Sequence, residues 1–501
     1  MNRSIIIIGA GIAGLSAGCY GQMNGYDTHI LELHDKPGGL CTSWDRKGYT
    51  IDGCIHWLVG TNPSSSMNQM WRELGAIKGK KIINHDEFLH IEGKSDKTFI
   101  LYTGVDRLEA HMKELAPGDA DVIEEFTGAI RFLSRIDMPL GKPREIASPL
   151  DGLKAIPMML PMLRYVMKWR KTSLKDYADR FKDPFLHEVF NVIFDIPDFP
   201  LLGLVFTMAW LNNKDAGYPE GGSLEFSRAI EDRYLKLGGE ISYKSRVEKI
   251  LVEGGRAVGV RLSDGGEHRA DTVISAADAY ATIFDMLDER YIDKEYRKWF
   301  DTMPIFEPLV HISVGVAADL SSEPSMLSYP LATPIEVAGK MRDRLNVENT
   351  SYDPTLAPSG KSVLIITLES NYPYWERLHE DKEAYRAEKE RIADDVVASL
   401  ETRFPSISGK VEMVDVATPI TFKRYTNNWQ GSFEGWLLTT DNMSTGIMKG
   451  LSRTLPGLDN FYMIGQWTKP GGGLPPAATS GREVIQIMCH REKRPFTTTE
   501  P

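Results

Sequence analysis

The stretch SIIIIGAGIAGLSAGCYGQMNGY, from Ser4 to Tyr26, contains no charged residue and decides the fold. Its first part, Ile5–Ile8, is a continuous β-branched run of the kind found in a strand buried on both faces. A helix is expected directly afterwards, from about Ile12 to Asn24. The bend between strand and helix carries three glycines in the spacing G-x-G-x-x-G: Gly9, Gly11 and Gly14.

A second strand, Asp27–Leu33, follows the helix and carries the acidic Glu32 near its end. Strand, glycine bend, helix, strand and acid form the βαβ pattern that binds a dinucleotide. In such a unit Gly9 makes the turn, Gly11 lets the backbone approach a pyrophosphate, and Gly14 lets the helix pack on the strand. Glu32 accepts hydrogen bonds from a ribose diol.

Three other interpretations of the opening stretch are weaker. Arg3 and the four isoleucines resemble a secretion signal, but the apolar core is too short, and the repeated glycines also argue against a membrane span. Gly14–Gly18 matches the G-x-S-x-G elbow of hydrolases. We expect Ser16 to lie inside the helix instead, with its hydroxyl bonded to the carbonyl four residues earlier.

Composition limits the class of protein. A chain of 501 residues predicts two or three domains, and 42% hydrophobic with 25% charged residues is typical of a globular protein. A net charge of −11, with no dense stripe of Lys and Arg, argues against nucleic acid as a partner. The four cysteines and the scattered histidines show neither disulfide nor metal-ligand spacing. We therefore expect no metal and a reducing cytoplasm.

Further glycine-rich blocks follow along the chain. Gly38-Gly39 comes shortly after Glu32 and is typical of a glycine-rich loop, and the pattern of residues 48–57 is typical of a hairpin. Far downstream, Gly221-Gly222-Ser223 precedes a helical pattern, and Val247 opens a series of short strands with glycine turns that predicts a β-meander.

The last block lies near the C-terminus. Residues 456–466 predict a turn and a buried strand, and residues 467–476 are rich in glycine and proline. A helix is expected from about Ala477 to Cys489, because proline suits a first helical turn.

Together these blocks resemble the FAD-dependent oxidoreductases that include phytoene desaturases, carotenoid isomerases and retinol saturase, which are relatives of the flavin amine oxidases. The resemblance spans nearly the whole chain. It implies an α/β fold: a Rossmann-like FAD-binding domain of the amine-oxidase type with an inserted α+β substrate domain. The implied FAD-binding domain comprises residues 1–74, 216–289 and 451–501, and the substrate domain comprises 75–215 and 290–450.

The resemblance implies FAD rather than NAD, because in this family a second glycine pair after the ribose acid marks FAD. A helix N-terminus aimed at the flavin pyrimidine also stabilises the negative charge of reduced flavin. Two positions depart from the family: Leu40 stands where many relatives have arginine, and Gln466 where many have aspartate. The implied FAD contacts are Gly9, Gly11, Ile12, Ala13, Gly14, Glu32, Leu33, Gly38, Gly39, Leu40, Thr42, Ser43, Ile55, His56, Trp57, Val247, Ala276, Gly465, Gln466, Gly472, Gly473, Leu474 and Ala477.

The catalytic candidate is His56, which aligns with the stretch that approaches the flavin ring in the family. It is the one titratable group nominated as proton donor or relay, although a buried, satisfied histidine is an equal alternative. The electron donor or acceptor is unidentified, because the sequence shows no second G-x-G-x-x-G after a strand and no closely spaced cysteine pair.

The inserts carry the substrate part. The uncharged run Phe199–Asn213 is too short to span a bilayer and is expected to line a core or a tunnel. Arg424–Trp436 is rich in aromatic residues and lies near the substrate cavity in the family, although a core position fits equally well.

Another segment of the first insert carries apolar residues at helical spacing. Pro157 and Pro161 interrupt that pattern, so a helix is expected to begin near Pro161. Basic residues follow it. The segment is either a helical part that rests on a membrane or an ordinary amphipathic helix. The spaced apolar residues are Leu153, Ile156, Leu160, Leu163 and Met167.

These observations predict an FAD-dependent oxidoreductase that acts on C–C or C=C bonds of an apolar polyene or isoprenoid-like small molecule. Saturation, desaturation and isomerisation stay open. One alternative is a flavin amine oxidase acting on a C–N bond, but such enzymes commonly carry a lysine in a central strand, and residues 308–315 have none. Another is a non-catalytic lipid-binding carrier on the same scaffold. The expected location is cytoplasmic, with contact at the inner face of the membrane as a further option.

Overall fold

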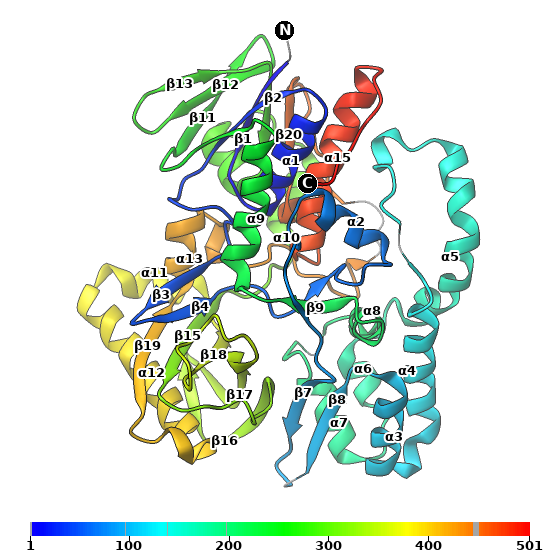
Figure 1. Ribbon diagram of the computed structural model, residues 1–501, viewed down its shortest axis with the longest axis vertical. Coiled ribbons are helices and arrows are strands. Elements are labelled where there is room, and N and C mark those ends of the chain that lie inside the picture. Colours follow the sequence, from blue (N-terminus) through cyan, green and yellow to red (C-terminus); the bar gives the residue numbers. More distant parts are fainter. Residues whose placement is uncertain (1–2, 96, 138, 197, 444–449) are drawn as a thin grey trace.

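The computed structural model describes residues 3–95, 97–137, 139–196, 198–443 and 450–501 (Figure 1). At its centre lies a five-stranded sheet in the order β10-β2-β1-β14-β20, in which all neighbours run parallel. The strands are β1 (Ser4–Ile8), β2 (Asp27–Leu31), β10 (Glu240–Ser242), β14 (Thr272–Ser275) and β20 (Phe461–Met463). The predicted βαβ unit is therefore confirmed, and the glycine bend lies at the carboxyl end of β1.

Three helices pack beside this sheet: α1 (Ile12–Met23), α9 (Gly222–Lys236) and α15 (Leu474–Arg491). α15 begins three residues before the predicted start, and Pro475 and Pro476 occupy its first turn. The prediction for Ser16 was half right. It lies inside α1, but its hydroxyl donates to the carbonyl of Ala478 in α15 at 2.6 Å, because the two helices pack closely.

The predicted meander is confirmed as an antiparallel three-stranded sheet beside the central one. Its strands are β11 (Val247–Glu253), β12 (Arg256–Leu262) and β13 (Glu267–Arg269). A single π-helical stretch, Ala281–Met286, and α10 (Lys294–Thr302) then lead into the second insert.

A seven-stranded mixed sheet, in the order β19-β15-β18-β17-β16-β7-β8, forms the second body of the molecule. The first insert supplies β7 and β8, and the second supplies the other five strands, so both inserts contribute to one sheet. α11 (Tyr372–Glu380) and α12 (Lys382–Arg403) pack on it. The strands are β7 (Glu87–Glu92), β8 (Thr98–Tyr102), β15 (Leu309–Val316), β16 (Met326–Val337), β17 (Lys340–Asn349), β18 (Ser362–Glu369) and β19 (Val411–Ala417).

Short strands connect the two bodies. They are β3 (Ser43–Arg46), β4 (Tyr49–Asp52), β5 (Leu58–Val59), β6 (Ile82–Ile83) and β9 (Ala216–Pro219). β3 and β4 form a hairpin, but it begins at Ser43, so the expected segment 48–57 supplies only its turn and second strand. The boundaries between the FAD-binding and substrate domains stay a prediction.

Except for α2, which precedes the first insert, and α13, the remaining helices belong to the lobe formed by the first insert (Figure 1). They are α2 (Ser66–Glu73), α3 (Val105–Leu115), α4 (Ala120–Leu133), α5 (Pro149–Trp169), α6 (Leu174–Ala178), α7 (Pro184–Val192), α8 (Leu201–Asn212) and, from the second insert, α13 (Pro419–Thr426).

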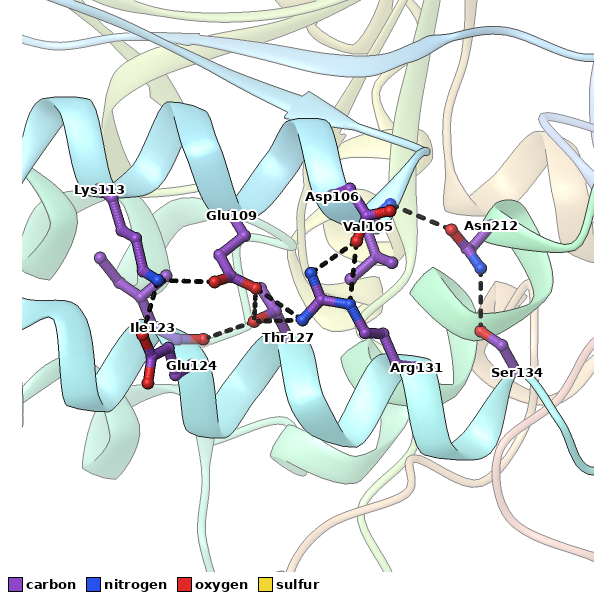
Figure 2. A network of polar contacts seen from close by, with 10 residues as sticks. All are labelled: Val105, Asp106, Glu109, Lys113, Ile123, Glu124, Thr127, Arg131, Ser134 and Asn212. Carbon is purple, nitrogen blue, oxygen red and sulfur yellow. Dashed lines mark hydrogen bonds and ion pairs between the residues drawn. The ribbon is translucent and has the colours of Figure 1, made fainter.

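A polar network fixes the α3–α4 hairpin of this lobe (Figure 2). The carboxylate of Glu109 accepts hydrogen bonds from Lys113 at 2.6 Å and Thr127 at 2.9 Å, and it lies 2.6 Å from Arg131. Burial opposes ionisation of Glu109, but these bonds outweigh it and lower the pKa to about 2. The hairpin is thus held by charge-assisted bonds along one edge.

Asn212, at the end of α8, joins that helix to the hairpin (Figure 2). Its side chain accepts a bond from the backbone of Val105 at 3.0 Å and donates to Ser134 at 3.2 Å. α8 is therefore anchored at its C-terminal end by polar contacts, although it is otherwise an almost wholly apolar helix.

α5 differs from its prediction. The helix begins at Pro149, not near Pro161, because Ser148 and Asp151 form a capping box that starts it four residues before Leu153, the first residue of the expected apolar pattern. It continues through both internal prolines. At its end Tyr165 packs on Phe132 of α4, with ring centroids 5.0 Å apart.

The apolar stripe of α5 faces outward. Its exposed fractions lie between 48% and 68%, far from those of core residues. Within the described residues, no helix has the length and apolar character that crossing a bilayer requires. The exposed side chains are Leu150, Leu153, Ile156, Leu160, Leu163 and Met167.

Candidate active site

A cavity of about 620 Å³ opens at the carboxyl edge of the parallel sheet, and residues of both bodies line it. This edge is where doubly wound sheets bind their ligands, because the loops there diverge and the helix N-termini point toward it. The site can be described from the glycine bend at one end to an aromatic wall at the other.

The glycine bend has an open, uncapped form. Gly9 has φ of +96°, which favours glycine, and Gly11 is the N-cap of α1 with φ of −66° and provides no capping side chain. A Cβ at Gly14 would lie 2.0 Å from the carbonyl oxygen of Gly9, so a side chain there would disrupt the bend. The N-terminus of α1 thus lies at the cavity without a capping side chain from its N-cap residue.

Glu32 lies at the end of β2 and is 5% exposed. One carboxylate oxygen accepts a bond from the backbone of Ala10 at 2.6 Å, and the other accepts one from His34 at 2.7 Å. Burial raises the pKa of Glu32, and these backbone bonds partly offset that rise. A carboxylate has further lone pairs, so the group can still accept bonds from hydroxyls in the cavity.

The structure brings most of the predicted FAD contacts to this cavity. Gly14, Thr42 and Ser43 are the exceptions among them, and the role of every one of these residues as an FAD contact stays a prediction. Gly14 packs closely against the backbone of Gly9 in the bend. The Ser43 hydroxyl accepts a hydrogen bond from the backbone of Leu224 at 3.2 Å. The predicted residues that line the cavity are Gly9, Gly11, Ile12, Ala13, Glu32, Leu33, Gly38, Gly39, Leu40, Ile55, His56, Trp57, Val247, Ala276, Gly465, Gln466, Gly472, Gly473, Leu474 and Ala477.

The C-terminal block faces the glycine bend across the cavity. Gly473 is the N-cap of α15 with φ of +92° and, like Gly11, provides no capping side chain. The side-chain nitrogen of Gln466 is buried and has no hydrogen-bond partner among the described residues. A hydroxyl-bearing ligand would supply the missing acceptor.

These features fit a flavin dinucleotide. The bend around Gly9 and Gly11 leaves room for a diphosphate, Glu32 can bind a ribose, and Gln466 has a free donor. The uncapped N-terminus of α15 would stabilise negative charge on a flavin ring.

His56 lines the cavity and contacts a residue that the sequence did not indicate. Its Nδ1 lies 2.6 Å from a carboxylate oxygen of Glu348 in β17, and the other oxygen of Glu348 accepts a bond from Tyr352 at 2.7 Å. Burial alone would lower the pKa of His56, but the charge of Glu348 and the hydrogen bond to it raise the pKa to about 9. His56 is therefore an imidazolium at neutral pH.

We predict that Glu348→Gln lowers the pKa of His56 by at least about one unit, because the negative charge that offsets the effect of burial is then absent. Selective histidine labelling and NMR titration measure this, with His56→Gln identifying the resonance. In the native protein, the stability contributed by the pair is present in full between about pH 4.5 and 6.5, is lost as the pH rises through about 9, and is also lost in acid as Glu348 becomes protonated. The variant should lack that loss, and an unchanged His56 titration would contradict the assignment.

The far end of the cavity is apolar. α8 supplies Gly203, Thr207 and Trp210, which confirms that part of the run Phe199–Asn213 lines a cavity, while most of its other residues are buried in the core. Phe194, Phe306 and Phe433 add to the wall. In the segment Arg424–Trp436 both interpretations hold: several residues line the cavity, and Trp436 is fully buried in the core.

Sequence reasoning missed three polar groups of the site. Glu348 lies 292 positions from His56 and has no local motif. Tyr352 lies behind it. Glu434 lines the cavity from within the aromatic segment, where the residues around it drew attention but the acid itself did not.

Comparison with known families gives one match over most of the chain. The family of flavin containing amine oxidoreductases matches residues 12–488.

The names of several similar proteins describe enzymes that act on polyenes. The chain is 26% identical to a chloroplastic prolycopene isomerase of Daucus carota, over 97% of this chain and 79% of that protein. It is 24% identical to a lycopene-forming phytoene desaturase of a Paracoccus species, over 97% of both chains. It is 23% identical to an all-trans-retinol 13,14-reductase of Danio rerio, over 97% of this chain and 86% of that one.

Solved structures share the fold. An oxidoreductase from Methanosarcina mazei has a TM-score of 0.59 at 18% identity, covering 96% of this chain and 100% of its own. Cyclohexylamine oxidase from Brevibacterium oxydans has a TM-score of 0.60 at 13% identity, covering 99% of this chain and 100% of its own.

Proposed function

The chain belongs to the flavin containing amine oxidoreductase family, and from this premise we propose that it is an FAD-dependent oxidoreductase acting on C–C or C=C bonds of an apolar polyene or isoprenoid. One observation carries the proposal: a single cavity has a dinucleotide cradle at one end and an aromatic wall at the other. The names of its relatives, an isomerase, a desaturase and a reductase of polyenes, support the substrate class.

In this proposal the cofactor exchanges a hydride equivalent with the substrate, and the protein holds both in place. Backbone N–H groups of the bend at Gly9 and Gly11 would hold the diphosphate, and Glu32 would hold the ribose. The charged His56 lines the cavity, and with FAD bound it would stabilise negative charge on the flavin ring or relay a proton. The aromatic residues around Trp210 exclude water from an extended apolar substrate.

The two alternatives have less support. β15 is the strand predicted at residues 308–315 and carries His311 but no lysine, unlike many amine oxidases. A lipid carrier without FAD would not need these three features in one cavity: the α1 N-terminus without a capping side chain, the buried carboxylate of Glu32 and the unpaired side-chain donor of Gln466.

We further propose that α5 rests on a membrane surface. Its apolar stripe is exposed, it packs on α8, which lines the apolar end of the cavity, and Lys168, Arg170 and Lys171 follow at its end. An apolar substrate could then pass from the bilayer to the cavity. The cytoplasmic location predicted from the cysteines stays a prediction, and the electron partner stays unidentified.

The test is a polyene panel with the FAD-loaded protein under anaerobic conditions. Carotenoids and retinoids are offered with oxidised and with chemically reduced cofactor, and products are read by mass and by ultraviolet spectrum. We expect a gain or loss of two hydrogens, or an isomer of unchanged mass. Hydrogen peroxide release on an amine panel, with no polyene converted, would contradict the proposal and favour the amine oxidase.

A further inference from the structure

We propose that Glu434 is the acid–base residue that gives a proton to, or takes one from, a substrate carbon in this cavity. The inference deepens the proposed function and rests on it. Adding a hydride equivalent and a proton across a C=C bond saturates it, and removing both creates the double bond. The cofactor accounts for the hydride equivalent, so the proton needs a protein group.

Glu434 lies where the flavin-binding end of the cavity meets the apolar end. A Cβ at Gly472 would lie 2.8 Å from the Cβ of Glu434 and 3.0 Å from its carboxyl carbon. Gly472 directly precedes Gly473, the N-cap of α15, and the aromatic Phe433 is the neighbour of Glu434 in the cavity wall. The carboxyl group is therefore between the predicted flavin-ring contacts and the substrate wall.

Two hydrogen bonds fix the backbone directly after Glu434. The carbonyl of Gly435 accepts a bond from Phe306 at 2.9 Å, and the carbonyl of Trp436 accepts one from Gly471 at 3.0 Å. A group that transfers protons to a carbon atom needs such support, because the distance to the reacting atom must be kept.

Glu434 differs from the other two carboxylates of the cavity wall. Glu32 accepts two backbone bonds, and Asp278 accepts bonds from Ala281 at 2.8 Å and Trp429 at 2.9 Å. Within the part of the chain that the structure describes, Glu434 forms neither a hydrogen bond nor an ion pair. Glu434 is half-buried in the cavity wall, so its carboxyl oxygens remain available to a substrate.

The electrostatic surroundings agree with this position. Burial raises the pKa of Glu434 to about 7, and the positive charge of His56 lowers it slightly. His56 and Cys54, both from the segment after β4, are the titratable groups that act on Glu434. Near neutral pH the carboxyl group is thus present in both protonation states, which suits proton transfer in either direction. His56, with its pKa near 9, releases a proton less readily.

The proton balance is simple. In saturation the O–H bond of protonated Glu434 breaks, its proton forms a C–H bond with one carbon, and the carboxylate keeps the electron pair of the O–H bond. The π electrons of the double bond form the new C–H bond, and the hydride equivalent completes the neighbouring carbon. In desaturation the neighbouring carbon loses its hydrogen with the C–H electron pair, as the hydride equivalent that oxidised FAD would take up. The carboxylate takes the hydrogen of the first carbon as a proton, and the electron pair of that C–H bond becomes the π bond.

The test compares FAD-loaded Glu434→Gln, Glu434→Asp and the native protein. The flavin absorbance of the native protein should shift between pH 6 and 8, with a midpoint near 7, and Glu434→Gln should lack this transition. With the polyene substrate, Glu434→Gln should lose roughly 10²- to 10⁴-fold in rate while cofactor loading is unchanged. Glu434→Asp should recover part of the rate, and in D₂O the native protein should place deuterium on a carbon that Glu434→Gln leaves unlabelled.

The matched control is Glu390→Gln in α12, an exposed glutamate without a hydrogen bond or ion pair among the described residues. It removes one carboxylate without touching the cavity and should behave as the native protein. A rate of Glu434→Gln within threefold of the native rate, or a persisting absorbance transition, would overturn the inference and leave the proposed function standing. Failure of the native protein to convert any polyene would overturn both.

Discussion

Replacing Gly11 by valine should give a folded protein that no longer retains FAD. A Cβ at Gly11 meets nothing closer than the carbonyl oxygen of Gly38 at 3.9 Å, and its φ of −66° suits any residue. The valine side chain instead enters the cradle where the diphosphate should approach the N-terminus of α1. Loss of two charge-assisted bonds, at about 1.5 kcal/mol each, weakens binding by roughly a hundredfold.

The measurement is cofactor content after purification and the Kd of FAD by fluorescence quenching, with circular dichroism to verify folding. Gly104→Val is the matched control, because Gly104 is the N-cap of α3 with φ of −76° and no atom within 4 Å of its Cβ position. It should bind FAD normally. Stoichiometric FAD in Gly11→Val would mean that the diphosphate does not lie on this bend.

Gly14→Val would be a poorer experiment on the same motif. Its Cβ would lie 2.0 Å from the Gly9 oxygen, so loss of FAD would follow from a broken bend as readily as from a blocked site. The three glycines of one motif therefore have separable roles, and Gly11 tests the ligand alone.

The parts of the fold that follow local rules were predictable from the sequence. The strand, glycine bend and helix around Gly9 depend on backbone conformation and burial within a few residues, so the local sequence pattern predicts them. The same holds for the meander after Val247. The predicted FAD contacts came from the glycine motif and the family resemblance, and most of them line one cavity in the structure.

The features that the sequence analysis predicted wrongly or missed depend on distant contacts or on competing local signals. Two prolines suggested a late start for α5, but the capping box of Ser148 and Asp151 starts it earlier. Ser16 bonds to α15 rather than to its own helix, since the two helices pack together. The pairing of His56 with Glu348 joins β17 to the segment after β4, and no sequence spacing encodes it.

The exposed stripe of α5 leads to the second large effect. The triple variant Leu153→Ser, Leu160→Ser and Met167→Ser should bind anionic vesicles roughly a hundredfold more weakly than the native protein. These residues lie seven positions apart on one face, and their side chains are 61%, 63% and 54% exposed. If each contributes about 1 kcal/mol by partial burial in the interface, their loss costs about 3 kcal/mol.

Cosedimentation with vesicles of phosphatidylglycerol and phosphatidylcholine measures this binding. The matched control changes three exposed apolar residues on other elements, Leu235, Met341 and Val414, to serine, and it should bind as the native protein does. Added salt should weaken native binding in part, because Lys168, Arg170 and Lys171 attract the anionic surface while the apolar contacts are unaffected by screening. Equal binding by both triple variants would show that α5 is not the contact surface, and the bilayer route to the cavity past α8 would then lose its support.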